Sequence, residues 1–190
     1  MRPTDDLREE HRAVKLMLRI LGGICKNIET GKNVKPEHLE KLIEFMKIFV
    51  DKCHHTKEEV YLFPEMEKAG IQGAEELTFS LSKEHEQGRQ YVSRIEKAVS
   101  EKEEHRGLST IVENSRAYIQ LLTPHIDKEE NNLFPMADVY LSQATQEKLL
   151  ETFEAVETEI IGSGRHEEFH KWLYTMAEIY AKPQTFSKKV

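Results

Sequence analysis

Apolar residues recur at intervals of three and four along most of the chain, the spacing that places side chains on one face of an α-helix. This pattern predicts four long helices. The first starts after Pro3 and stops near Gly31, and the second opens around Pro36. The third covers about residues 74–102, and the fourth begins near Gly107. Pro124 lies inside the fourth helix, and because proline lacks an amide donor we expect it to bend or interrupt that helix.

Two shorter helical stretches follow from about Ala144, separated by residues 162–164, which read Gly-Ser-Gly. No segment alternates apolar and polar residues as a strand does. Short connections between four amphipathic helices predict an all-α fold, specifically an antiparallel up-down four-helix bundle. We expect residues 1–142 to form this bundle and residues 143–190 to form a C-terminal helical extension packed on it.

The composition narrows the function classes. The chain has 190 residues, of which 38% are hydrophobic and 32% charged, and its net charge is −7. No apolar run approaches the ~20 residues that span a bilayer, and the charge disfavours binding to nucleic acid. The first residues, MRPTDDLREEHR, contain no apolar segment typical of a secretion signal. We therefore expect a cytoplasmic protein with no membrane or nucleic-acid partner.

An internal repeat divides the predicted bundle into two helical hairpins. The segment HHTKEEVYLFP, residues 54–64, aligns with HIDKEENNLFP, residues 125–135, and seven of the eleven positions are identical. A Glu-His pair precedes each copy, at residues 10–11 and 84–85. Each hairpin thus has a histidine on its first helix and a His-x-x-x-Glu motif on its second.

Six polar residues interrupt the apolar faces of the four predicted helices. A buried carboxylate without a partner is costly, and two of them in one core require positive partners. Imidazole nitrogens and carboxylate oxygens form a common ligand set for transition metals, and residues four apart share one helix face. The sequence therefore predicts a metal site with these six ligands: His11, His54, Glu58, His85, His125 and Glu129.

Four nitrogens and two carboxylates are enough for two metal ions. If both glutamates bridge the metals, each metal receives two histidine nitrogens and two glutamate oxygens. An oxo or hydroxo bridge then supplies a fifth ligand, and octahedral iron keeps one position for a small molecule. We expect two iron ions, Fe²⁺ or Fe³⁺, in this arrangement.

The repeat fixes the register of the predicted ligands. His55 and Glu59 also stand four residues apart, but His55 aligns with Ile126, so a symmetric site cannot use it. Glu59 aligns with Glu130 and is at best an outer partner of the ligands. Gly88, one turn beyond the third-helix histidine, either makes room beside the metals, allows close approach of two helices, or lies harmlessly at the surface.

The six spaced ligands, with LFP after both Glu-Glu pairs, resemble the hemerythrin-like HHE cation-binding domain over about residues 5–141. This resemblance implies a four-helix bundle around a non-haem di-iron centre. Oxygen-carrying members have a second histidine where this chain has Arg89, and a carboxylate five residues after the fourth-helix histidine, whereas Glu129 follows His125 by four. The chain is more similar to the four-His, two-Glu branch, which includes bacterial iron-sulfur repair proteins.

Two other patterns compete with this interpretation. Residues 166–170 read HEEFH, which matches the H-E-x-x-H signature of zinc metalloproteases. We expect instead a solvent-facing histidine pair on a terminal helix whose apolar side packs inward. That side consists of Phe169, Trp172, Leu173 and Met176. Cys25 and Cys53 are too far apart along the predicted hairpin for a disulfide, and we expect reduced thiols. Tyr118 lies on the core face two turns before His125, where it either fills core or hydrogen bonds near the metals.

The expected function is to bind a small ligand, O₂, NO or H₂O₂, at a bridged di-iron centre, for sensing, storage or detoxification. The alternative is a di-iron enzyme, or an iron donor in the repair of damaged iron-sulfur clusters. The same six ligands serve both, so the sequence leaves open whether the protein is an enzyme, and it does not identify a protein partner.

Overall fold

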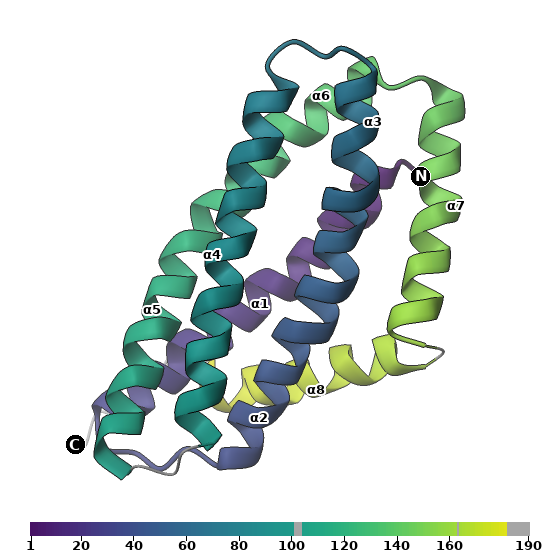
Figure 1. The fold of residues 1–190 in the computed structure, drawn as a ribbon. Coiled ribbons are helices and arrows are strands. Elements are labelled where there is room, and N and C mark those ends of the chain that lie inside the picture. The colour runs from purple at the N-terminus through teal and green to yellow at the C-terminus, as the bar shows by residue number, and fades with distance from the viewer. Residues whose placement is uncertain (101–103, 163, 182–190) are drawn as a thin grey trace, which may run out of the picture.

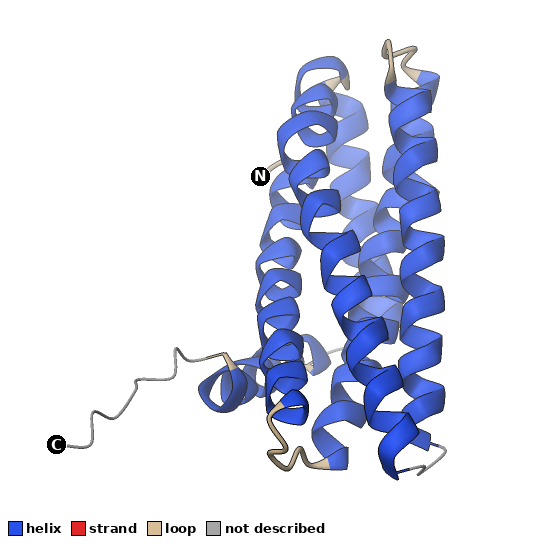
Figure 2. Cartoon of the chain, turned by 90° about the vertical axis from the view of Figure 1, so that its left-hand side faces the viewer, coloured by secondary structure: helices blue, strands red, loops and turns tan. Residues whose placement is uncertain are grey.

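The computed structural model describes residues 1–100, 104–162 and 164–181, and every regular element in these ranges is helical (Figure 1). Loops are confined to short connections between the helices (Figure 2). The all-α prediction is confirmed. The elements, with π-helical segments labelled η, are α1 Pro3–Glu29, α2 Pro36–Phe45, η1 Met46–His55, η2 Lys57–Leu62, α3 Phe63–Lys68, α4 Ala74–Ser100, α5 Glu104–Lys128, η3 Glu129–Leu133, α6 Phe134–Tyr140, α7 Gln143–Ile160 and α8 Arg165–Tyr180.

The long helices agree with the apolar pattern, with differences at their ends and interiors. The expected end of the third helix at Lys102 lies outside the described residues. The predicted interruption at Pro124 is wrong, because α5 continues through this residue. Proline in a helix interior costs about 3 kcal/mol, and the packing of α5 against α1 and α4 offsets that cost.

The π-helical segments are a feature that the apolar spacing did not predict. η2 and η3 begin at or next to the Glu-Glu pairs of the two repeat copies, so the wider turn is itself repeated. π-helical turns are rare and often occur at functional sites. Here they place Glu58 and Glu129 in the part of the helix where the hydrogen-bond pattern changes.

Four long helical stretches lie side by side: α1, the continuous run from α2 to α3, α4, and the run from α5 to α6 (Figure 1). α5 packs against both α4 and α1, and α2 packs against α4. Their buried apolar side chains form two clusters. One contains Val14, Phe49 and Leu122, and the other, nearer α3 and α6, contains Leu7 and Phe134. The six predicted ligands fall between these two clusters along the helices, so apolar layers close the site on both sides.

The two C-terminal helices, α7 and α8, are separated at residues 162–164, as predicted, and both pack against α1. Phe169 and Leu173 of α8 are buried in the core cluster that also contains Phe49. A side chain at Gly23 would come within 1.9 Å of the Tyr180 carbonyl oxygen, so only glycine allows the end of α8 to lie on α1. The division at residue 142 stays a prediction.

Among the described residues, no helix combines the length and the apolar character needed to cross a bilayer.

Candidate metal centre

The structure brings all six predicted ligands into the interior between the two apolar clusters. Their exposed fractions lie between 0% and 3%. In the described part of the chain, two groups of ligand atoms lie close enough to share an ion, and Glu129 belongs to both. The groups are His11, His54, Glu58 and Glu129, and His85, His125 and Glu129.

The four histidines form two pairs, one from each hairpin. The Nε2 atoms of His11 and His54 are 3.1 Å apart, and those of His85 and His125 are 2.9 Å apart. Two nitrogens at this separation can bind one ion together. The pairing follows the repeat, because each pair combines the histidine of a Glu-His pair with the histidine of the following His-x-x-x-Glu motif.

Each glutamate directs its two oxygens toward different histidine pairs. In Glu58, Oε1 lies 3.6 Å from Nε2 of His54, and Oε2 lies 3.6 Å from Nε2 of His85. In Glu129, Oε2 lies 3.3 Å from Nε2 of His11, and Oε1 lies 3.2 Å from Nε2 of His125. Each carboxylate therefore spans the two positions that the histidine pairs define.

These four carboxylate oxygens are buried without a hydrogen-bond partner among the described residues. A buried carboxylate that lacks both hydrogen bonds and a cation is strongly destabilising. Cations between the glutamates and the Nε2 atoms would satisfy all of them at once. The donor set and its unpartnered oxygens thus fit a pair of metal ions.

The electrostatics of the two glutamates lead to the same conclusion. Burial raises the pKa of Glu58 well above its usual value, and the charge of Glu129 raises it further. Burial acts in the same direction on Glu129, but the charge of His125 and the imidazole of His11, whose Nε2 lies 3.3 Å away, hold the pKa of that carboxyl well below its usual range. Two adjacent carboxylates in a dry site repel each other, and a cation between them stabilises both charges.

A second layer of carboxylates holds the other nitrogen of every histidine. Each Nδ1 donates to one carboxylate, which directs Nε2 toward the centre and fixes the ring orientation. The four contacts are His11 to Glu130 at 3.1 Å, His54 to Glu10 at 2.7 Å, His85 to Glu59 at 2.7 Å, and His125 to Glu84 at 2.9 Å. These contacts obey the same internal symmetry as the ligands.

A third layer of cations pairs with these carboxylates. The pairs are Lys57 with Glu10, Lys128 with Glu84, Lys15 with Glu130, and Arg89 with Glu59. Lys57 and Lys128 are equivalent in the repeat, and so are Lys15 and Arg89, each four residues after a ligand histidine. Arg89 thus stands where oxygen carriers have a histidine, and it supports Glu59.

All six predicted ligands lie at the centre of this arrangement, but the sequence pattern predicts little of the support around them. Glu10 and Glu84 were visible as the first members of the repeated Glu-His pairs, yet the pattern alone assigned them no role. Glu59 was expected to be an outer partner at best, and the structure places it on His85. The sequence does contain a sign of this support, because charged residues as well as the predicted ligands recur at equivalent positions in the two hairpins.

His55 lies outside the ligand groups, as the register predicted. Its ring stacks on the ring of His85, with centroids 3.7 Å apart, and its Nδ1 lies 3.4 Å from Asp51. Gly88 is buried, and a Cβ there would come within 3.3 Å of the Tyr118 ring, so it allows close approach of α4 and α5. Tyr118 is itself buried.

The histidine pair His166 and His170 lies on α8, with ring centroids 4.6 Å apart. Among the described residues it is not part of any group of three that could hold an ion. The expectation that the pair faces solvent is only partly right, because both rings lie beside Phe49. Of the four residues predicted to pack inward, Phe169, Leu173 and Met176 are buried, and Trp172 is half-buried against the core.

Both cysteines are free and buried. Burial raises the pKa of the Cys53 thiol to about 12, and the charge of Glu10 acts in the same direction. A thiol with so high a pKa stays protonated at neutral pH. Cys53 therefore contributes to packing next to His54 and is a poor nucleophile.

Comparisons with known proteins agree with this geometry. Three curated relatives, described as uncharacterized proteins of Mycobacterium bovis and of two strains of Mycobacterium tuberculosis, are each 26% identical over 152 residues. The match covers 79% of this chain but only 59% of each relative's length. No solved structure matches.

A family model described as the hemerythrin HHE cation binding domain matches residues 2–137, which include all six predicted ligands and all eight residues of the surrounding carboxylate and cation layers. The chain therefore belongs to the hemerythrin HHE cation-binding domain family.

Proposed function

We propose that this chain is a non-haem di-iron protein that binds a small ligand, O₂, NO or H₂O₂, for sensing, storage or detoxification. The observation that carries the proposal is the convergence of four Nε2 atoms on four buried carboxylate oxygens that have no hydrogen-bond partner among the described residues. The expected scaffold is an antiparallel up-down four-helix bundle, and family membership supports cation binding.

The proposed ligands are divided between two ions. His11 and His54 would bind one, His85 and His125 the other, and Glu58 and Glu129 would bind both. The predicted oxo or hydroxo bridge between the ions belongs to this proposal. Iron in this setting supplies a redox-active Lewis acid that can bind a small oxygen- or nitrogen-containing molecule.

The chain's own residues prepare the site in three ways. The outer carboxylates fix the histidine tautomers and rings, so little reorganisation is needed when a cation binds. Shared glutamates place one negative charge between two cations. The rings of Phe134, stacked on His11 at 5.3 Å, and of Phe63, stacked on His85 at 6.3 Å, exclude water from one side of the site.

The first test is the metal content of protein produced in iron-supplemented medium. We expect close to two irons per chain, in keeping with the two histidine pairs. Stoichiometric zinc with less than one iron would contradict the iron assignment while leaving the site intact, since affinity alone does not favour iron over zinc.

The second test separates binding from catalysis. Reduced, iron-loaded protein is mixed separately with O₂, H₂O₂ and NO, while its absorption spectrum and the ligand concentration are followed. Reversible spectral changes without consumption of ligand would support a binding protein. Multiple turnovers would support the alternative, a di-iron enzyme.

A further inference from the structure

Two cavities lie at equivalent places in the two hairpins. The first, which we call the His55 cavity, has a volume of about 270 Å³ and is lined by Met46, His55, Gly88, Arg89, Val92 and Tyr118, among others. The second, the Ile126 cavity, has a volume of about 350 Å³, and its lining includes Lys15, Leu18, Thr123 and Ile126. His55 aligns with Ile126, Arg89 with Lys15, and Val92 with Leu18.

The two cavities differ in the polar groups that lie deep within them. Every buried side chain lining the Ile126 cavity is apolar, and its charged residues are exposed or half-buried. The His55 cavity is lined by two buried polar side chains, His55 at 5% exposure and Tyr118 at 2%. Apolar walls with a few converging polar groups are typical of small-molecule sites.

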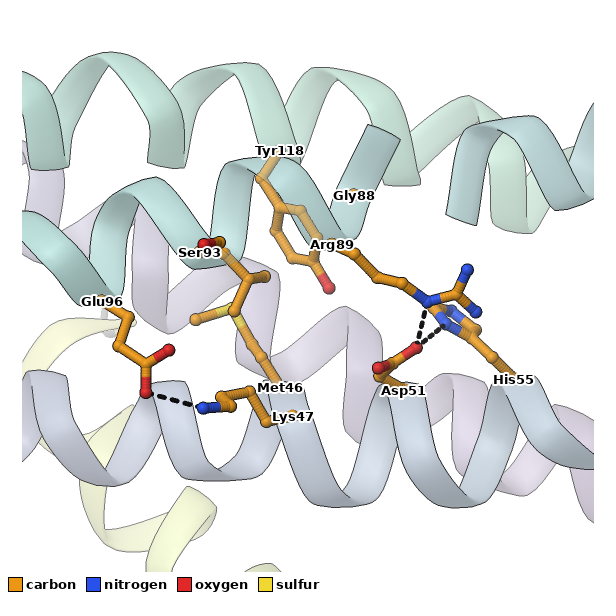
Figure 3. Close-up of a pocket in the computed structure, with 10 residues that line it drawn as sticks. Met46, Lys47, Asp51, His55, Gly88, Arg89, Ser93, Glu96 and Tyr118 are labelled. Atoms are coloured by element: carbon orange, nitrogen blue, oxygen red, sulfur yellow. Dashed lines mark hydrogen bonds and ion pairs between the residues drawn. The ribbon is translucent and has the colours of Figure 1, made fainter. Parts of the chain in front are cut away.

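The Tyr118 hydroxyl is directed into the His55 cavity. Figure 3 shows the ring reaching from α5 past Gly88 toward the space between α4 and the helix that carries Met46 and Asp51. The described residues give this hydroxyl no hydrogen-bond partner, and its oxygen is not fully enclosed, so water in the cavity can reach it. A ligand with a hydrogen-bonding oxygen can take the place of that water and keep the hydrogen bond.

His55 connects this cavity to the metal centre. Its imidazole forms part of the cavity wall and stacks on His85, whose Nε2 belongs to the ligand set. At the rim, Arg89 pairs with Asp51 and Lys47 pairs with Glu96, so the charges there compensate one another (Figure 3). The rim therefore presents no net charge to an uncharged molecule.

We propose that the small ligand reaches the centre through the His55 cavity, and not through the Ile126 cavity. This inference rests on the proposed function. The ligand class is a small uncharged molecule with an oxygen that forms hydrogen bonds, held by the Tyr118 hydroxyl and the His55 imidazole before it passes the His55 ring. The histidine that replaces isoleucine at this repeat position gives one of two equivalent cavities a polar interior.

The test compares variants that fill one cavity at a time. Val92→Phe and Leu18→Phe place the same larger side chain at repeat-equivalent positions. The association of NO with reduced, iron-loaded protein is followed by stopped-flow absorption. We expect Val92→Phe to slow association roughly tenfold and Leu18→Phe to leave it near the rate of the unmodified protein.

Location is measured independently of iron chemistry by soaking crystals of the unmodified protein in methanol, a small uncharged molecule whose one oxygen forms hydrogen bonds. We expect methanol in the His55 cavity, beside the Tyr118 hydroxyl, and its displacement in Val92→Phe crystals. Ser93→Phe, at an exposed residue lining the same cavity, serves as a second filling variant if Val92→Phe folds poorly. Methanol confined to the Ile126 cavity would overturn the proposal.

The polar role of the cavity is tested with Tyr118→Phe, which removes only the hydroxyl. We expect it to slow the reaction with H₂O₂, which forms strong hydrogen bonds, and to leave NO association nearly unchanged. Equal slowing of both would make Tyr118 a packing residue and overturn the recognition part of the proposal.

If the unmodified protein binds neither ligand at its metals, the proposed function fails. If the unmodified protein binds them and Val92→Phe associates with NO at the same rate, only the proposed access route fails.

Discussion

The two hairpins of the repeat carry the same inner layers and different surroundings. The ligands, the carboxylates behind them and the cations behind those carboxylates occur at matching positions in both hairpins. The differences begin in the outermost of these layers. Lys57 is fully buried, whereas its equivalent Lys128 is 36% exposed, and His55 corresponds to Ile126.

The difference has a structural origin in the C-terminal helices. α7 packs against η1 and η2 of the first hairpin, and the buried Lys57 lies near Glu157 of α7 and the ring of Phe153. The comparison teaches that metal chemistry constrains the layers nearest the ligands in both halves. Beyond those layers, each hairpin is free to acquire its own packing and its own access to the centre.

Removal of the charge from Glu58 or Glu129, the two proposed bridges, should give the largest effect. We expect Glu58→Gln and Glu129→Gln each to reduce iron from about two ions per chain toward one, because the proposed carboxylate bridges are what hold both ions together. Iron content and Mössbauer spectra of the oxidised variants measure this.

The control for these variants is Glu9→Gln, at an exposed residue paired with Arg12. It should leave the iron content and magnetic coupling unchanged. A Glu58→Gln or Glu129→Gln variant that keeps two magnetically coupled ferric ions would refute the double bridge. Unequal iron loss between the two variants would show that the halves are not equivalent at the metals.

The next comparison concerns adjacent histidines. His54→Ala should strongly lower the metal content because it removes a proposed ligand. His55→Ala should leave it nearly intact, since His55 stacks on His85 and lies outside the ligand groups. Metal analysis of the two purified variants decides the matter. Similar losses in both would mean that the register is wrong by one residue.

The sequence was sufficient for the all-helical fold, the positions of the helices and the convergence of the six candidate ligands, because all three follow from local periodicity and an internal repeat. His54 and Glu58, for example, lie four residues apart and therefore share one face of a helix with about four residues per turn. The features that the sequence did not predict depend on contacts between segments far apart in the chain. The bond from Glu10 to His54 joins two helices, and the continuation of α5 through Pro124 relies on packing against α1 and α4.

The sequence could not predict the burial of Lys57 either. α7 covers this residue, whereas Lys128, at the equivalent position of the repeat, is partly exposed. We expect Lys57→Met to lower the free energy of unfolding by about 3–5 kcal/mol, since it leaves Glu10 and Asp6 without their cation. Lys128→Met should cost only about 0–1 kcal/mol because that pair is partly exposed to solvent. Urea denaturation of both variants measures the difference. Equal costs would show that burial does not distinguish the two lysines.

The smallest expected effect tests whether the outer carboxylates are equivalent. Glu10→Gln and Glu84→Gln keep an oxygen that accepts from Nδ1 but remove the charge that makes the imidazole a better ligand. We expect each to weaken metal binding about 10- to 100-fold, with circular dichroism unchanged. Competition with a chelator measures the loss, and Glu113→Gln at the surface provides a control. Because Glu10 is 4% exposed and Glu84 is 20% exposed, Glu10→Gln should lie nearer the upper end of that range. Unchanged affinity in both variants would mean that packing alone orients the histidines, and a larger loss in Glu84→Gln would contradict the link between burial and the strength of this support.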